Sequence, residues 1–155
     1  NYPLNTKATM IVSWLKKVIM ELVIPEGIRL EEAFDTDIQI YIDGERLRRA
    51  VINIFDNACQ ALQEIPKSNN CKRVVRFCTQ NLEDQLEIAC INTGPRIPDE
   101  VLPHIFEPLY STKGFGNGLG LPIVKHILEQ HGGTVKINSD DKIGTKFSLC
   151  LPLMR

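Results

Sequence analysis

The sequence lacks three features that would each point to a large class of proteins. Its five cysteines include no C-x-x-C pair and no regular spacing, which disfavours a zinc site or a disulfide framework and favours a reducing compartment. No apolar run approaches the roughly 18 residues that a membrane helix needs, and no secretory signal opens the chain. The formal net charge of -1 argues against broad electrostatic capture of nucleic acid, so any anion site is local.

The length and composition bound the domain count. A chain of 155 residues with 43% hydrophobic and 24% charged residues is long enough for one well-cored domain and too short for two. We therefore expect residues 1–155 to form a single globular unit. The sequence opens at Asn1 without a methionine, and we expect a fragment of a longer protein.

Hydrophobic periodicity predicts an α/β protein. A long segment rich in Pro and Gly, residues 93–118, interrupts the pattern and includes one short helical stretch near residues 99–105. The expected architecture is a two-layer α/β sandwich in which helices cover one face of a mixed, mostly antiparallel sheet. Helices are predicted over residues 4–22, 45–62 and 119–130, and strands over residues 28–34, 38–42, 74–79, 86–92, 134–138 and 145–151.

Two asparagines stand out in the second predicted helix, in RRAVINIFDNACQAL. Asn53 and Asn57 are four residues apart, so they lie on one face of the helix. The simpler interpretation is a pair of surface or capping amides. The functional alternative is a magnesium site, because a carboxamide oxygen is a suitable ligand for an ion that keeps waters and phosphate oxygens in its shell.

The segment CINTGPRIPDE, residues 90–100, follows a predicted strand. The strand ends at Asn92, Gly94 begins a turn, and a short helix follows Ile97. This pattern is typical of an ordinary strand-to-helix turn. Its functional interpretation places the Asn92 side chain at the bottom of a pocket, with Ile97 in the wall.

The segment from FEPLYSTK to the third helix has the composition of an anion site. Thr112 and Lys113 supply a hydroxyl and a cation, although they also suit a solvated loop. Gly116, Gly118 and Gly120 then alternate directly before a helix, whose first N–H groups have no partner within the helix. This spacing is neither the dinucleotide fingerprint G-x-G-x-x-G nor a P-loop.

In this order, the segments resemble the ATP-binding catalytic domain of sensor histidine kinases, a branch of the superfamily that includes gyrase, the Hsp90 chaperones and MutL. RRAVINIFDNACQAL resembles the N box of that family, CINTGPRIP its G1 box, FEPLYSTK its F box and GNGLGLPIVKHILEQHGG its G2 box. GTKFSLCLP resembles its final strand. Each box alone is weak evidence, but four in the correct order are strong, and the implied fold is the Bergerat-type sandwich.

The resemblance implies ATP and Mg²⁺ as ligands. Asn57 would coordinate the magnesium, and Asn53 would support the phosphate region. Thr145 would approach the adenine, and residues 93–118 would form a lid over the nucleotide. The triphosphate would meet backbone N–H groups and the positive end of the third helix, at Gly116, Gly118, Leu119 and Gly120, next to Thr112 and Lys113.

Three positions depart from the family pattern. The family has aspartate where this chain has Asn92, and an amide that turns its one carbonyl oxygen toward adenine would bind less tightly, by about 1–2 kcal/mol. Arg96 replaces a glycine near Gly94 and Ile97, so it would either reach a phosphate or hinder the base. Gln60 replaces a lysine and removes a positive contact.

The resemblance also favours phosphoryl transfer over ATP hydrolysis. Relatives that hydrolyse ATP carry a glutamate base at the position of Asn53, whose amide has no useful basicity. None of the three histidines, His104, His126 and His131, lies in the motif of a phosphate-accepting histidine. The acceptor is therefore expected on a dimerisation domain outside this chain.

These expectations describe a cytoplasmic kinase domain. Its expected protein partners are the dimerisation domain of the same protein and, indirectly, the receiver domain of a response regulator, and no nucleic acid is expected. The full-length protein is expected to be a homodimer that a region outside this sequence can attach to a membrane. The alternative is a degenerate regulatory module with weak or no ATP binding.

Overall fold

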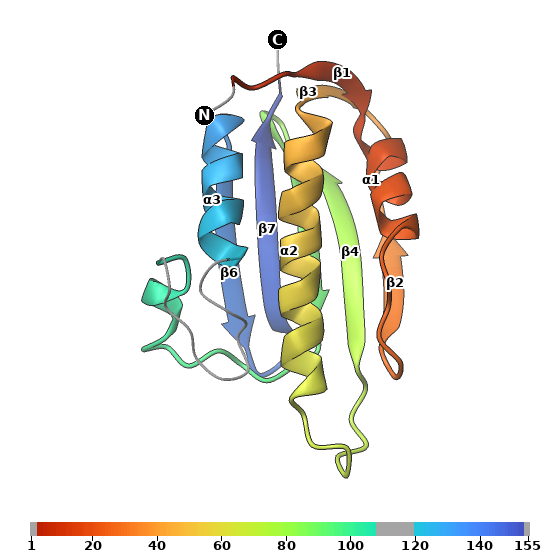
Figure 1. Cartoon of the computed structure of the whole chain (residues 1–155), viewed down its shortest axis with the longest axis vertical. Coiled ribbons are helices and arrows are strands. Elements are labelled where there is room, and N and C mark those ends of the chain that lie inside the picture. The colour runs from red at the N-terminus through yellow and green to blue at the C-terminus, as the bar shows by residue number, and fades with distance from the viewer. Residues whose placement is uncertain (1–2, 108–119, 154–155) are drawn as a thin grey trace.

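The computed structural model describes residues 3–107 and 120–153, and Figure 1 shows their arrangement. The main sheet has five strands in the order β2-β4-β5-β7-β6, in which β2 runs parallel to β4 and the other neighbours are antiparallel. A separate pair, β1 (Lys7–Met10) and β3 (Gln39–Ile42), lies at one end. The main-sheet strands are β2 (Arg29–Ala33), β4 (Val74–Asn81), β5 (Gln85–Asn92), β6 (Thr134–Asp140) and β7 (Gly144–Pro152).

Three helices cover one face of this sheet: α1 (Ile11–Met20), α2 (Gly44–Gln63) and α3 (Gly120–Gln130) (Figure 1). The core lies between the two layers, where Phe55 of α2 stacks on Phe77 of β4 with ring centroids 6.1 Å apart. Asp43 begins α2 by accepting a hydrogen bond from the backbone N–H of Arg46, as its position before the helical pattern predicts. The expected α/β sandwich with a mixed sheet is confirmed.

The predicted first helix is wrong at its beginning. Residues 4–22 have helical periodicity, but Lys7–Met10 form β1, which pairs with β3 before α1 begins at Ile11. Pairing with a strand far along the chain supplies backbone hydrogen bonds that local periodicity does not reveal. The short helix expected near residues 99–105 is a 3₁₀ turn at Leu102–His104.

The start of α1 is held by a carboxylate from elsewhere in the sequence. Met10 offers no capping side chain, and Asp37 instead accepts hydrogen bonds from the N–H of Val12 at 2.7 Å and of Ser13 at 3.0 Å, and from the Ser13 hydroxyl at 2.6 Å. Burial alone raises the pKa of Asp37, but these hydrogen bonds and one from the N–H of Ile38 outweigh it and lower the pKa below its ordinary value.

Replacing this remote cap is expected to destabilise the domain. Asp37→Ala leaves the first N–H groups of α1 without their acceptor, and we expect a loss of about 1–2 kcal/mol at neutral pH in urea denaturation. Because the folded-state pKa is lowered, the stabilisation by Asp37 is complete above the ordinary carboxyl range and disappears as the pH falls through the lowered value. The difference between the two proteins should therefore shrink in acid. Glu129→Ala, which removes an exposed carboxylate from α3, serves as the control.

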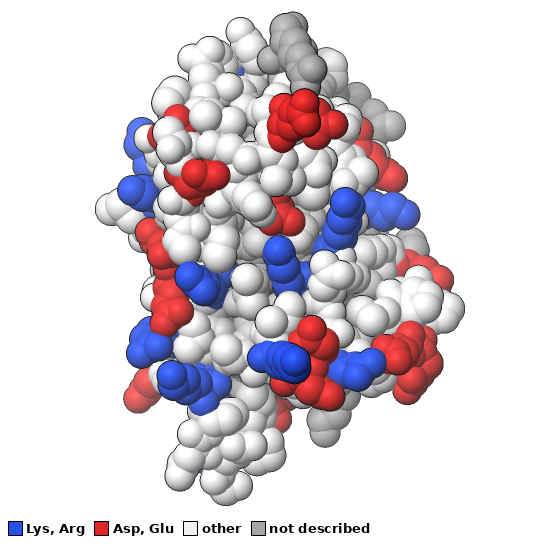
Figure 2. Space-filling view, turned by 180° about the vertical axis from the view of Figure 1, so that it is seen from behind, with Lys and Arg blue, Asp and Glu red and all other residues white. Residues whose placement is uncertain are grey.

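The other face of the main sheet, seen in Figure 2, carries none of the helices that the structure describes. Lys and Arg side chains are interspersed with Asp and Glu on this face, and Lys146 of β7 pairs with Glu87 of β5 at 3.5 Å. Among the helices that the structure describes, none has the length and apolar character needed to cross a bilayer.

Candidate nucleotide-binding site

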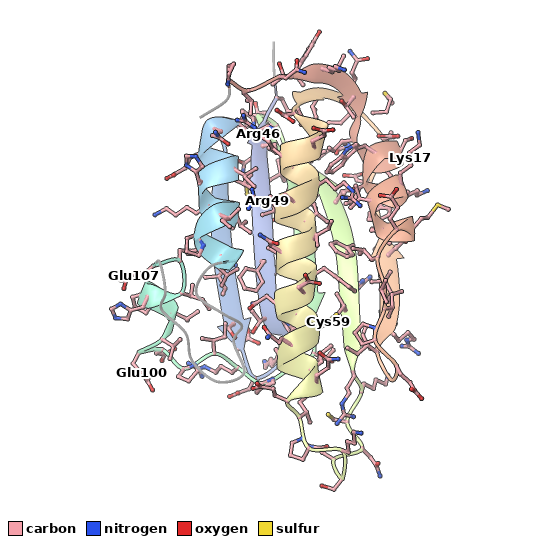
Figure 3. The ribbon with its side chains drawn as sticks, viewed as in Figure 1. Lys17, Arg46, Arg49, Cys59, Glu100 and Glu107 are labelled. Atoms are coloured by element: carbon pink, nitrogen blue, oxygen red, sulfur yellow. The ribbon has the colours of Figure 1, made fainter. Side chains whose placement is uncertain are left out.

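The sequence-predicted site residues that the structure describes gather at one end of the molecule, around the second half of α2. In Figure 3, Cys59 marks this half of α2, and Glu100 and Glu107 mark the segment that lies beside the beginning of α3. Two contacts join these elements. The Asn53 amide of α2 donates to the carbonyl oxygen of Gly120 in α3 at 3.4 Å, and a Cβ atom at Gly94 would lie 3.6 Å from Ala61.

Asn57 has the properties of a ligand-binding side chain. Only 8% of its surface is exposed, and its carboxamide has no hydrogen-bond partner among the residues that the structure describes. Buried polar groups are normally paired, so an amide that finds no partner among the described residues is available to a further partner, one helical turn from Asn53 and from Ala61. The Asn57 oxygen also suits Mg²⁺, which takes few protein ligands when phosphate oxygens and waters complete its shell. The described residues hold no cluster of three His, Cys, Asp or Glu side chains that would form an independent metal cage.

Asn92 closes the end of β5 and is 2% exposed. It faces Thr145 of β7 across the sheet, and Thr145 is 3% exposed. Its Oδ1 oxygen accepts a hydrogen bond from the backbone N–H of Gly94 at 2.9 Å. One lone pair of this oxygen is therefore used within the turn, and the predicted contact with adenine stays a prediction.

Arg96 pairs with acidic side chains after the turn at Gly94 and in the turn between β6 and β7. Its guanidinium pairs with Asp99 at 2.8 Å and lies 3.9 Å from Asp141 in the turn between β6 and β7. These pairs raise the pKa of Arg96, chiefly through the hydrogen bond to Asp99. The prediction that Arg96 reaches a phosphate or hinders the base concerns the bound nucleotide and stays a prediction. Gln60 is exposed near the end of α2.

Ser139 is a site-supporting residue that sequence reasoning missed. Its hydroxyl accepts a hydrogen bond from the N–H of Ile97 at 2.8 Å and lies 2.8 Å from the Thr145 hydroxyl. It thereby ties the segment after Gly94 to β7 and holds the Ile97 side chain at 2% exposure. The alternation of β6, in which residues 135, 137 and 139 are the less exposed ones, is the signal that turns Ser139 to the helical side.

Two cysteines near this end are poor nucleophiles, because burial disfavours the thiolate. Burial raises the pKa of Cys59 to about 12, with a smaller contribution from Asp56, and burial also raises the pKa of Cys90. Both thiols are therefore protonated at neutral pH.

Part of the predicted site lies outside the described residues. Gly120 is the first residue of α3, so the expected helix follows the glycine run. The remaining predictions in this segment concern Thr112, Lys113, Gly116, Gly118 and Leu119, all of which lie outside the described residues.

Comparison with known proteins places this arrangement in a family. Residues 42–155 match the family described as histidine kinase-, DNA gyrase B- and HSP90-like ATPases. The sensor histidine kinase ZraS of Escherichia coli K12 is 34% identical over 121 residues, which cover 78% of this chain and 24% of that protein. Sporulation kinase C of Bacillus subtilis is 38% identical over 111 residues, which cover 72% and 24%. This chain thus spans about a quarter of the length of these relatives.

Solved structures agree on the fold. The catalytic domain of the histidine kinase ThkA superposes with a TM-score of 0.79 at 23% identity, covering 98% of this chain and all of that one. The mycobacterial sensor histidine kinase MprB gives a TM-score of 0.72 at 25% identity and 97% coverage of both chains. The chain belongs to the family of histidine kinase-, DNA gyrase B- and HSP90-like ATPases and is an ATP-binding catalytic domain of the histidine kinase type.

Proposed function

We propose that residues 1–155 form the single ATP-binding domain of a sensor histidine kinase and transfer the γ-phosphoryl group of ATP to a histidine on a separate dimerisation domain. The observation that carries this proposal is the buried carboxamide of Asn57 near the beginning of α3, which has no hydrogen-bond partner among residues 3–107 and 120–153. In the proposed complex the triphosphate lies between these elements, and the base lies at Asn92 and Thr145.

Mg²⁺ bound to Asn57 and the phosphates would neutralise charge that develops on the transferred group. The chain's own contribution is positioning. Asn53 holds the beginning of α3 against α2 through the Gly120 carbonyl, so the partly positive N-terminal end of α3 stays near Asn57. Because Asn53 is not a base, it does not activate water, and transfer to a side chain is favoured over hydrolysis. Docking of the acceptor histidine then completes the reaction.

The partners follow from this role. They are ATP, the dimerisation domain of the same protein and, through the phosphohistidine, the receiver domain of a response regulator. We place the domain in the cytoplasm and propose a homodimeric full-length protein, with any membrane attachment outside residues 1–155. A degenerate regulatory module is the second candidate, favoured by one observation: the Asn92 oxygen that would accept from adenine already shares one of its two lone pairs with the Gly94 N–H.

Calorimetric titration with ATP and Mg²⁺ tests the proposal. We expect magnesium-dependent binding that Asn57→Ala weakens about tenfold or more, because the substitution removes the only protein ligand proposed for the metal. Without magnesium the variant and the unchanged protein should bind ATP almost equally weakly. Asn138→Ala, which removes an exposed amide from β6, is the matched control and should leave the affinity unchanged. Nucleotide binding that ignores both Asn57 and magnesium would contradict the proposal, and no nucleotide binding at all would favour the regulatory module.

A further inference from the structure

A groove between α2 and α3 lies outside the proposed nucleotide site. Its volume is about 450 Å³. The α2 wall is formed by Arg46 and Arg49, which Figure 3 labels on the side of α2 that faces α3. The α3 wall includes Ile123 and Ile127, which are four residues apart and therefore lie on one face of that helix. The groove thus has one basic wall and one aliphatic wall.

The basic wall carries a positive charge that an acidic partner can neutralise. The described residues that line the groove include no Asp or Glu. Arg46 is shared with Asp43, whose carboxylate lies 3.6 Å from the arginine Nε atom. Arg49 is exposed and forms no ion pair or hydrogen bond with any residue in the ranges 3–107 and 120–153. Two residues three apart are separated by about 4.5 Å along a helix axis, which matches carboxylates one turn apart on a second helix.

One end of the groove adjoins the proposed phosphate end of the nucleotide site. Arg49 is one turn before Asn53 on α2, and Ile123 is one turn after Gly120 on α3. Asn53 and Gly120 are in contact at 3.4 Å, and this contact lies between the groove and Asn57, one turn of α2 further on. An element seated in the groove therefore extends toward the phosphoryl group that is to be transferred.

We propose that this groove is a docking surface for the dimerisation domain that carries the acceptor histidine, and that Arg49 binds a carboxylate on a helix of that domain. The inference rests on the proposed function and deepens it by assigning the surface and the chemistry of its partner, an amphipathic helix with acidic side chains beside aliphatic ones. Such a helix covers the aliphatic wall, and the charge pair fixes its position along the groove.

The size of the groove favours a partner in the same protein over a separate one. Stable complexes between free proteins bury roughly 800 Å² on each partner, and a single groove between two helices offers only part of such an interface. A free helix therefore binds there weakly. Tethering within one protein raises the effective concentration of the partner, so that a weak and reversible contact is still populated.

The experiment measures autophosphorylation of the full-length protein that contains this chain, as the initial rate of transfer of a radiolabelled γ-phosphoryl group from ATP with Mg²⁺. Arg49→Glu places a carboxylate against the acidic helix, and we expect it to lower the rate about tenfold. Arg49→Lys keeps the positive charge and should retain most of the rate. Lys17→Glu is the matched control, because it makes the same change of charge on an exposed position of α1, away from α3 (Figure 3).

Two further measurements distinguish docking from nucleotide binding. Calorimetric titration of residues 1–155 with ATP and Mg²⁺ should give the same affinity for Arg49→Glu and the unchanged chain, because Arg49 lies outside the proposed nucleotide site. Added salt should lower the autophosphorylation rate of the unchanged protein more than that of Arg49→Glu, because salt screens the attraction between exposed charges.

The outcomes separate the two proposals. An unchanged rate in Arg49→Glu, with its melting temperature preserved, would overturn the docking proposal and leave the kinase proposal standing, and the groove would then be open to a separate protein. An equal loss of rate in Lys17→Glu, or weaker ATP binding by Arg49→Glu, would also overturn it. Absence of labelling in the unchanged full-length protein would overturn both proposals.

Discussion

Gly144→Ala is expected to destabilise the domain by about 3 kcal/mol and to impair nucleotide binding at the same time. Gly144 begins β7 with a φ of 84°, a conformation that residues with a side chain rarely adopt. A Cβ atom there would overlap the carbonyl oxygen of Asn92 and lie 3.2 Å from that of Gly94. Both obstacles are backbone atoms, so the end of β5 and the turn after it must move together.

The matched control is Gly27→Ala, because Gly27 has a similar φ of 87° but no atom within 4 Å of an added Cβ. This control carries only the conformational cost, about 1 kcal/mol. Urea denaturation should therefore rank the two variants clearly, and the melting temperature of Gly144→Ala should fall by roughly 10 °C. Equal losses in the two variants would show that the crowding at Asn92 has no effect. Nucleotide affinity should fall for Gly144→Ala alone.

The sequence was most informative where the structure depends on residues that are close together in the chain. The stripe that includes Leu47, Ile54 and Leu62 predicts α2, and the glycine run before residue 121 correctly precedes α3. Spacing also places Asn53 and Asn57 on one helical face, and the structure puts Asn53 against Gly120. The four ordered boxes then identify the family, because their order is far more specific than any single box.

What the sequence could not predict depends on contacts between distant segments. The strand Lys7–Met10 exists because β3 pairs with it, and α1 begins where Asp37 supplies a cap from 24 or 25 residues away. The direction of the Asn92 amide depends on the closeness of the Gly94 N–H, which no propensity encodes. Likewise, the contact of Arg96 with Asp141 joins segments that lie far apart in the sequence, so no local pattern predicts it.

The second large effect is expected in the core between α2 and the sheet. Phe77→Ala should lower the free energy of unfolding by about 4 kcal/mol, since it removes a completely buried ring and leaves a cavity under α2. Phe77 is 0% exposed and stacks on Phe55 with an interplanar angle of 22°, so the loss includes the contact between the two rings. Chemical denaturation with urea, followed by circular dichroism, measures the change.

Two further variants test whether this loss comes from the cavity in the core or would follow from shortening any apolar side chain, including an exposed one on a helix. Phe77→Leu fills most of the space and should cost clearly less than Phe77→Ala, and Met20→Ala, at a side chain that is 83% exposed, should change stability by less than about 0.5 kcal/mol. Phe77 supports α2, the helix that carries Asn53 and Asn57. Phe77→Ala should therefore also broaden the binding curve in a titration with magnesium and ATP. A stability loss as small as that of Met20→Ala would contradict the packing of Phe55 on Phe77 as the centre of this core.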